Sequence, residues 1–411
     1  MSTKSRFKSV AAAGIIFQAG SAAIDSATIM SSLVYQLTGS PIAVGAVTAI
    51  LRFGWLFPQL IVGFLAQRGG SSMRYYIVGA FGRASCMALL ALLLTFGSRI
   101  PTLTLSILVL AIWTAYSFIS GIVAVPYNDI VARSVPSELR SRLLATRFFG
   151  GGVLALGVVA IADHLTSTLV FPLSYAAIIA MASVLMFLSS AVFTAMGEPE
   201  STAETPHKPT FFQYLKDGGA VFRTDLKFRK FVYAQWCGGA VLMAMPFYVV
   251  QADVNGINLK DVALLLGAQT AGALISNALW GWWGAHFGKA SLLKGIAVGR
   301  IFPPAMILLL AFNRYFPDSQ MFYVFVGIFF ILGALANGLT IAVIGFLMEI
   351  SPENLRPAYS GYFNAITAPA FLLPLLAGIV ATVFGLTLVF AISMIAAILQ
   401  AFFLMRIVAK Q

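Results

Sequence analysis

Charged residues are scarce in this chain of 411 residues. Asp, Glu, Lys and Arg make up 10% of the sequence, while hydrophobic residues make up 60%. A soluble domain carries about 25% charged and about 45–50% apolar residues. A water-soluble core of this length could not bury so much apolar surface, whereas a helix in a bilayer can be apolar on every side. The composition therefore predicts an integral membrane protein.

The sequence also has few residues that support redox, metal or catalytic chemistry. Its two cysteines, Cys86 and Cys237, lie in different apolar segments, and its three histidines share no ligand spacing. We therefore expect no metal site and no cofactor. No zinc-protease motif, nucleophile elbow or nucleotide-binding loop is present, which indicates that the chain is neither an enzyme nor an ATP-driven pump.

The net charge of +12 does not indicate nucleic-acid binding. The lysines and arginines lie almost entirely in short loops between apolar segments, without the basic and aromatic stripe of a nucleic-acid groove. Basic loops of this kind normally set the orientation of a membrane protein.

Twelve apolar segments are long enough to span a bilayer. They lie at about 10–37, 41–66, 75–98, 102–130, 143–164, 170–196, 228–252, 261–285, 290–312, 320–348, 358–382 and 385–407. We therefore predict an all-α membrane protein with twelve transmembrane helices in two pseudo-symmetric six-helix bundles. The predicted domains are an N-terminal bundle (1–196), a cytoplasmic linker (197–227) and a C-terminal bundle (228–411).

The basic loops predict the orientation of these helices. Nineteen lysines and arginines fall on the side that holds both termini and the linker, and three fall on the other side. Basic loops stay in the cytoplasm, so both termini are expected there. We expect a multi-pass protein of the plasma membrane, which is the inner membrane if the source is prokaryotic.

The two halves repeat each other at an offset of about 217 residues. Gln18 corresponds to Gln235 and Arg83 to Arg300, and the segments 63–70 and 135–140 have counterparts at 281–288 and 351–356. Parallel repeats of six helices, with a binding site at their interface, recur among transporters.

The repeated segment resembles the Gly-x3-Asp-Arg-x-Gly motif of the major facilitator superfamily, and the resemblance covers the whole chain. Gly63, Arg68 and Gly70 match the first copy, and Gly281 and Gly288 match the second. The aspartate of the motif is replaced by Gln67 and Ala285, and the second arginine by His286, so the usual gate latch is altered. The resemblance implies a secondary transporter that works by alternating access, with helices 1, 4, 7 and 10 lining the cavity.

A cytoplasmic gate is expected from these motif positions and from charged residues near the cytoplasmic side. Asp129 and Glu349, at the ends of helices 4 and 10, are the expected partners of Arg83 and Arg300. The predicted gate residues are Gly63, Arg68, Gly70, Arg83, Asp129, Gly281, Gly288, Arg300 and Glu349.

Asp25 is the acidic residue nearest the middle of a predicted span, where charge is costly and marks functional sites. Together with Gln18, Ser21, Thr28, Ser32 and Gln36 it forms one polar face of a helix. Arg52 lies at a similar depth on the second helix, so the two could form an ion pair. Three roles remain open: proton coupling through Asp25, a static pair that joins two helices, or direct contact with the solute.

Further cavity candidates have a polar or aromatic side chain on a helix face expected to point inward. For each one, packing between helices is an equally good explanation. They are Gln18, Ser21, Thr28, Gln59, Trp113, Tyr116, Ser120, Gln235, Trp236, Gln269, Asn277, Trp280, Asn337 and Asn364.

The sequence thus predicts a monomeric secondary active transporter for a small organic solute, with symport or antiport driven by protons through Asp25 as one hypothesis. Four arginines in the spans (Arg52, Arg83, Arg147 and Arg300) against one central aspartate favour an anionic or zwitterionic solute. The alternatives are a lipid, lysolipid or amphiphilic drug transporter, and a receptor or assembly factor that keeps the fold without moving solute.

Overall fold

The computed structural model of the protein describes residues 3–66, 71–198, 219–258, 261–312, 318–351 and 356–406. Within these ranges all regular elements are helices, and they form an all-α membrane fold of twelve spans in two six-helix bundles. Contacts divide the chain into two compact units. Unit 1 is Met1–Gly39, Val47–Lys208 and Asn258–Gly267, and unit 2 is Ser40–Ala46, Pro209–Ile257 and Ala268–Gln411. Most of the predicted linker lies outside the described residues.

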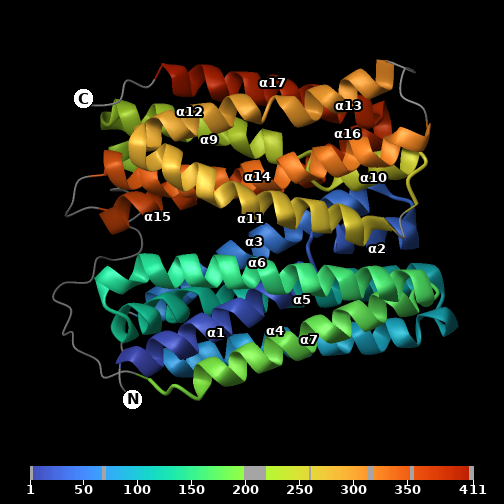
Figure 1. Cartoon of the computed structure of the whole chain (residues 1–411), viewed down its shortest axis with the longest axis horizontal. Helices are drawn as coiled ribbons and strands as arrows, with labels where there is room; N and C mark the ends of the chain where they lie inside the picture. Colours follow the sequence, from blue (N-terminus) through green and yellow to red (C-terminus); the bar gives the residue numbers. More distant parts are fainter. Residues whose placement is uncertain are drawn as a thin grey trace. The chain divides into compact units, whose positions relative to one another are not determined.

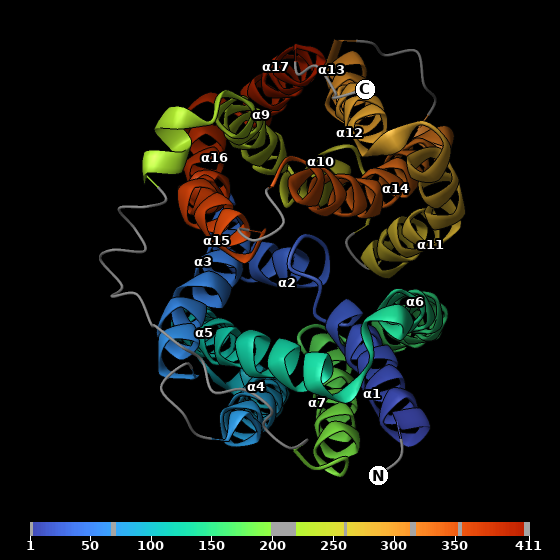
Figure 2. The same ribbon diagram turned by 90° about the vertical axis from the view of Figure 1, so that its left-hand side faces the viewer.

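Unit 1 contains the helices of the N-terminal half. They are α1 (Thr3–Ala22), α2 (Ile29–Thr38), α3 (Pro41–Ala66, from Val47 onward), α4 (Ser72–Thr95), the short η1 (Gly97–Arg99), α5 (Thr102–Ser134), α6 (Ser137–Thr168) and α7 (Leu173–Thr194). Helix α4 packs against α5 and α7, and α1 packs against α6 and α7 (Figures 1 and 2).

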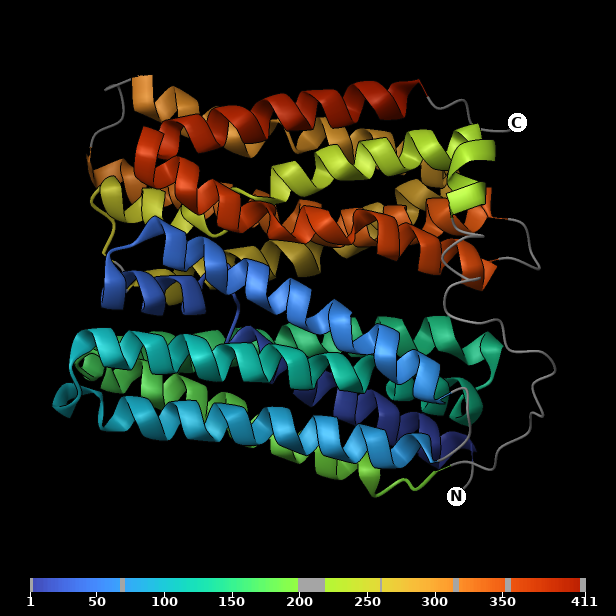
Figure 3. The same ribbon diagram turned by 180° about the vertical axis from the view of Figure 1, so that it is seen from behind.

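Unit 2 contains the helices of the C-terminal half. They are α9 (Leu226–Leu242), α10 (Phe247–Val254), α11 (Val262–His286, from Ala268 onward), α12 (Gly288–Gly299), α13 (Phe302–Phe312), α14 (Asp318–Ile350), α15 (Arg356–Thr367), η4 (Ala368–Leu372), α16 (Leu373–Phe384) and α17 (Leu386–Met405). Helix α17 packs against α9, α12 and α13, and α12 also packs against α14 (Figure 3).

The described helices match the predicted spans. Nine of them are long and apolar enough to cross a membrane. Two shorter apolar helices, Pro41–Trp55 and Ala368–Phe384, coincide with the predicted second and eleventh spans. The first span consists of α1 followed by α2. The chain is therefore a multi-pass membrane protein.

Several spans are interrupted, and here the structure differs from the sequence prediction. The first span, expected as one helix over 10–37, ends at Ala22 and resumes at Ile29. The seventh ends at Leu242 and resumes at Phe247, which is nearly the same place in the repeat. Pro246 explains the second break, since proline has no N–H and clashes with the carbonyl four residues earlier. Non-helical backbone inside a membrane must be satisfied by protein or water.

Candidate functional site

The break in the first span is stabilised by the side chain of Asp25. Its Oδ1 atom accepts hydrogen bonds from the backbone N–H of Ala27 at 3.0 Å and of Thr28 at 2.9 Å. It also accepts one from the hydroxyl of Thr28 at 2.8 Å. A carboxylate that accepts from the second and third N–H groups after it makes the hydrogen bonds of an N-cap, and it lies near the N-terminal end of α2, where the helix dipole favours negative charge. The residue directly before α2 is Thr28, whose side chain makes no capping bond. Asp25 therefore caps the turn that leads into α2.

Arg52 lies on α3 close enough to interact electrostatically with Asp25. Its side chain is exposed at the surface of the protein, whereas Asp25 is half-buried. The helix that carries Arg52 also contacts the break directly, because the hydroxyl of Thr48 donates to the carbonyl of Ser26 at 3.5 Å. The two charged residues singled out in the sequence are thus neighbours in unit 1.

The polar face predicted for the first span does not form a single stripe, because the break separates its two ends. On the C-terminal side of the break, Thr28 and Ser32 are fully buried. The hydroxyls of Ser32 and Tyr175 are 2.7 Å apart, and the amide of Gln36 donates to Tyr175 at 2.8 Å. This part of the face therefore packs against α7 inside unit 1. On the N-terminal side of the break, Ser21 has a buried hydroxyl without a hydrogen-bond partner among the described residues.

The aromatic candidates on α5 take part in packing. Trp113 is fully buried, and its indole N–H donates to the carbonyl of Val47 at 2.9 Å. The ring of Tyr116 stacks on it with centroids 5.0 Å apart, and Ser120 is also buried. In this conformation these three side chains present almost no surface to a solute. Gln59 belongs to a part of α3 whose side chains lie outside the described set.

The amide candidates of unit 2 divide into two groups. Asn337 donates to Asn277 at 3.3 Å, and Trp280 donates to the carbonyl of Ala334 at 2.7 Å, so these three join α11 to α14. Gln235 and Gln269 differ, since each has a buried amide atom without a hydrogen-bond partner among the described residues. A buried amide needs such a partner, which a polar solute could supply.

The remaining two candidates of unit 2 contribute less to a polar site. Trp236 is half-buried, and its ring packs against the apolar core of the unit. Asn364 is exposed on α15.

The ends of α4, α5 and α7 meet in a charged network. Arg133 donates to Asp129 at 2.5 Å and to Glu198 at 3.0 Å. Glu198 also accepts from Ser71 and from the backbone N–H of Ser72, while the hydroxyl of Ser72 donates to Asp129. Partial burial opposes ionisation of Glu198, but the bonds from Ser71 and Arg133 outweigh it and hold the pKa of that carboxyl below its usual value.

This network corrects the predicted partner of Asp129, which is Arg133 one turn away and not Arg83. The corresponding prediction for Arg300 is also wrong. Arg300 donates to the side chain of Gln400 at 2.7 Å and to the carbonyl of Gly238 at 2.9 Å, whereas Glu349 is exposed on α14. A glutamine and a peptide carbonyl thus satisfy donors that were assigned to a carboxylate.

The structure describes the glycine motif positions of the second copy but only part of the first. Gly288 has φ +80°, a conformation that favours glycine, and it begins α12 directly after α11 ends. Gly281 is exposed near the end of α11. In the first copy Gly63 lies within α3, while Arg68 and Gly70 lie outside the described residues. The gate role of these residues stays a prediction.

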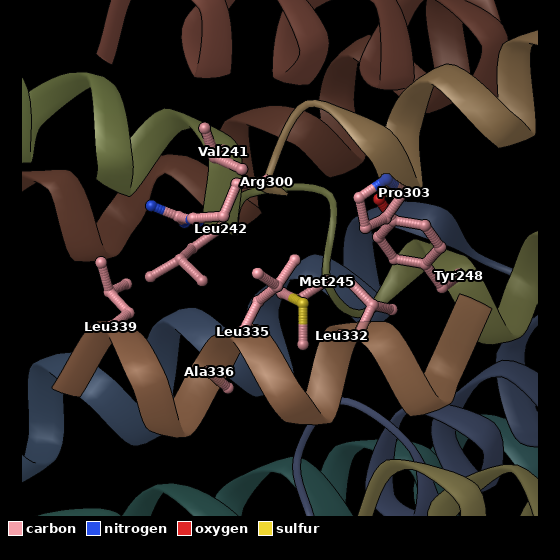
Figure 4. A pocket seen from close by; sticks show the side chains of 10 residues that line it. All are labelled: Val241, Leu242, Met245, Tyr248, Arg300, Pro303, Leu332, Leu335, Ala336 and Leu339. Atoms are coloured by element: carbon pink, nitrogen blue, oxygen red, sulfur yellow. The ribbon is translucent and has the colours of Figure 1, made fainter. Parts of the chain in front are cut away.

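A small pocket opens where α9 ends, and sequence reasoning did not find it. Leucines of α14 (Leu332, Leu335 and Leu339) point toward Leu242 and Met245 at the break, with Arg300 at one end and Tyr248 at the other (Figure 4). Its volume is about 40 Å³, which is enough to hold water. Pro246 and Pro303, which interrupt neighbouring spans, were the signal in the sequence.

Comparison with known proteins agrees with this architecture. Residues 10–368 match the family described as Major Facilitator Superfamily, and no curated protein matches at a significant level. Similar solved structures include a mutant of the nucleoside transporter NupG, at 12% identity and TM-score 0.75 over 98% of this chain and 100% of that one. A D-xylose-proton symporter has 14% identity and TM-score 0.68 over 98% of each chain. A mutant of the peptide transporter POT has 14% identity and TM-score 0.70 over 98% and 93%. At such identities the likeness establishes a common fold.

Proposed function

Because the chain belongs to the major facilitator superfamily, we propose that it is a secondary active transporter of a small organic solute, working by alternating access in the plasma membrane with both termini in the cytoplasm. The observation that carries the proposal is the capped break in the first span. A membrane protein that served only as a rigid scaffold would gain nothing from non-helical backbone and a carboxylate at this depth.

The break offers a way for a proton to act on the helices. Ionised Asp25 accepts three hydrogen bonds in the turn just before α2 and interacts electrostatically with Arg52. Protonation would weaken all of these interactions, because the neutral carboxyl is a poorer acceptor and has no charge for the helix dipole or the guanidinium. The join between α1 and α2 would then loosen. We propose that proton uptake by Asp25 is thereby coupled to movement of the first span.

The solute is proposed to be anionic or zwitterionic. Arg52, Arg83, Arg147 and Arg300 lie within or at the edges of the spans, and Asp25 is the central carboxylate. An excess of cations in the spans favours a ligand of opposite charge. Gln235 and Gln269 each have a buried amide atom without a hydrogen-bond partner among the described residues, and these atoms would suit the polar groups of such a molecule.

Two steps test this function. Purified full-length protein is first screened for compounds that raise its melting temperature, since a ligand of the native state stabilises it. The panel contains organic acids, amino acids, sugars, nucleosides and lysolipids. Compounds that stabilise are then offered to proteoliposomes with and without an inward proton gradient, and accumulation above the outside concentration is expected only with the gradient. Binding without any flux would instead support a receptor, and movement of lysolipids alone would support a lipid transporter.

A further inference from the structure

Two arginines of unit 1 approach each other between α1, α4, α5 and α6. Arg83 is the twelfth residue of the 24-residue α4 and has only 6% of its surface exposed. Its guanidinium lies over the ring of Phe17, 3.9 Å from the centroid. Arg147 on α6 packs against Gly14, where an added Cβ would come within 2.5 Å of its Cδ atom. Gly14 and Phe17 lie on one face of α1, so both arginines meet the same side of that helix.

Tyrosine side chains surround this arginine pair. The hydroxyl of Tyr127 accepts a hydrogen bond from Arg147 at 3.0 Å, and its ring lies 5.4 Å from the Arg147 guanidinium carbon. Tyr76 lies with its ring 6.4 Å from that of Tyr127. Arg83 interacts electrostatically with Tyr76, Tyr116 and Tyr127, and also with Arg147 itself. The arginines therefore share one environment, in which they repel each other.

The described carboxylates of unit 1 are engaged elsewhere. Asp25 caps the turn before α2, and Asp129 and Glu198 bind Arg133. Asp163 is sixteen residues beyond Arg147 on α6, which is about 24 Å along the helix. Asp261, the remaining described carboxylate of the unit, interacts electrostatically with Asp163. Among the residues that the structure describes, none forms an ion pair with Arg83 or Arg147, and the Nε atoms of both are buried without a hydrogen-bond partner. A buried charge without compensation is strongly destabilising.

The internal repeat supplies a comparison for Arg83. Its counterpart Arg300 has its donors occupied by Gln400 of α17 and by the carbonyl of Gly238. In unit 1 the helix that packs beside Arg83 is α7, and its Ser183 donates to the carbonyl of Ala84 at 2.9 Å instead. The hydrogen bonding of the two equivalent arginines thus differs between the halves. Unit 2 satisfies its arginine with protein groups, while in unit 1 the buried Nε atom of Arg83 has no hydrogen-bond partner among the described residues.

We propose that Arg83 and Arg147 bind the anionic group of the transported solute, a carboxylate or a phosphate, beside the hydroxyls of Tyr116 and Tyr127. Arginine presents a planar fork of donors that fits both groups, and a hydrogen bond between charged partners is about twice as strong as a neutral one. Such a group would relieve the repulsion between the two arginines. The inference rests on the proposed function and names the residues that bind the negative charge of the solute.

The test uses purified full-length protein in neutral detergent at constant ionic strength. Its melting temperature is followed by tryptophan fluorescence during titration with sodium phosphate, sodium succinate, glucose and short-chain phosphatidic acid. We expect phosphate or succinate to raise the melting temperature and glucose to leave it unchanged. Arg83→Gln and Arg147→Gln should weaken anion binding at least about tenfold, a loss of about 1.4 kcal/mol. The matched control is Arg406→Gln, because exposed Arg406 lies over Phe402 at 4.0 Å with the same ring contact, and it should bind as the wild type does.

A second measurement separates ligand binding from a structural role. Without added anion, Arg83→Gln should melt no lower than the wild type, since the substitution removes an uncompensated buried charge. If Arg83 instead held helices together, the Arg83→Gln variant would have a lower melting temperature than the wild type. The proposal is overturned if no soluble anion stabilises the wild type, if both variants respond as it does, or if only phosphatidic acid binds. Anion binding without flux would refute transport and leave the site standing, whereas flux with an unchanged KM in both variants would refute the site alone.

Discussion

The Oδ1 atom of Asp25 accepts two hydrogen bonds from Thr28, one from its hydroxyl at 2.8 Å and one from its backbone N–H at 2.9 Å. These two hydrogen bonds from one residue fix the turn between the break and α2. Asp25 therefore contributes two properties, a capping oxygen and a titratable charge. Mutation separates them, because asparagine retains the capping oxygen without the charge and alanine retains neither property.

The capping task predicts different stabilities for two substitutions. Asp25→Ala leaves the N–H groups of Ala27 and Thr28 without their acceptor, which should cost about 1–3 kcal/mol. Asp25→Asn should stay within about 1 kcal/mol of the wild type, since asparagine is an equally good cap. Thermal unfolding of the purified variants measures both. Equal melting temperatures for the two variants would show that the cap does not stabilise the protein.

The network at Glu198 predicts a loss of stability in acid. Its pKa is lower in the folded protein than the ordinary value, which is about 4.3 in an unfolded chain. The stabilisation is therefore fully present above pH 5 and disappears as the pH falls through the lower, folded pKa. Because Glu198 is partly exposed, we expect on the order of 1 kcal/mol or less.

Melting curves between pH 3.5 and 7 check this prediction. Glu198→Gln should lower the melting temperature at pH 7 and remove this part of the acid dependence. Glu349→Gln, at an exposed glutamate of α14, serves as the control and should follow the wild-type curve. The assignment fails if Glu198→Gln and the wild type lose stability in parallel as the pH falls.

Close contact between α11 and α14 predicts a strong effect at one glycine. A Cβ added to Gly272 would come within 1.9 Å of the carbonyl oxygen of Phe330, and backbone cannot yield as a flexible side chain can. Gly272→Ala should push the helices apart, weaken the bond between Asn277 and Asn337, and lower the melting temperature by several degrees.

Gly327, a glycine of α14, provides the matched control. A Cβ added to Gly327 would meet nothing within 4 Å, so Gly327→Ala should be neutral or stabilise by up to about 1 kcal/mol through helix propensity. A melting temperature of Gly272→Ala as high as that of Gly327→Ala would contradict the close approach of α11 and α14.

Much of the fold could be predicted because hydrophobic length and repetition are local properties of the sequence. The twelve spans, the repeated halves and the proximity of Asp25 to Arg52 follow from segment lengths and from the short turn between the first two helices. The break at Asp25 was missed because a three- and four-residue polar spacing describes both a helix face and a cap followed by its helix. The spacing of Asp25 and Thr28 was the available signal.

Other features of the site depend on contacts that no local pattern encodes. Ser32 meets Tyr175 across 143 residues, and Glu198 binds Ser72 across 126. The partner of Asp129 is a different case, because Arg133 lies four residues away on the same helix, where side chains are neighbours. The spacing of four residues indicates that pair, and the expected partnership with Arg83 overlooked it.

The most direct test of the account compares two kinds of transport in the Asp25→Asn variant, using a solute that stabilises the wild type. The variant keeps the cap but cannot exchange a proton. In proteoliposomes it should still exchange labelled for unlabelled solute across the membrane, while its accumulation driven by a pH gradient should fall at least about tenfold. Accumulation equal to that of the wild type under the same gradient would contradict proton coupling through Asp25.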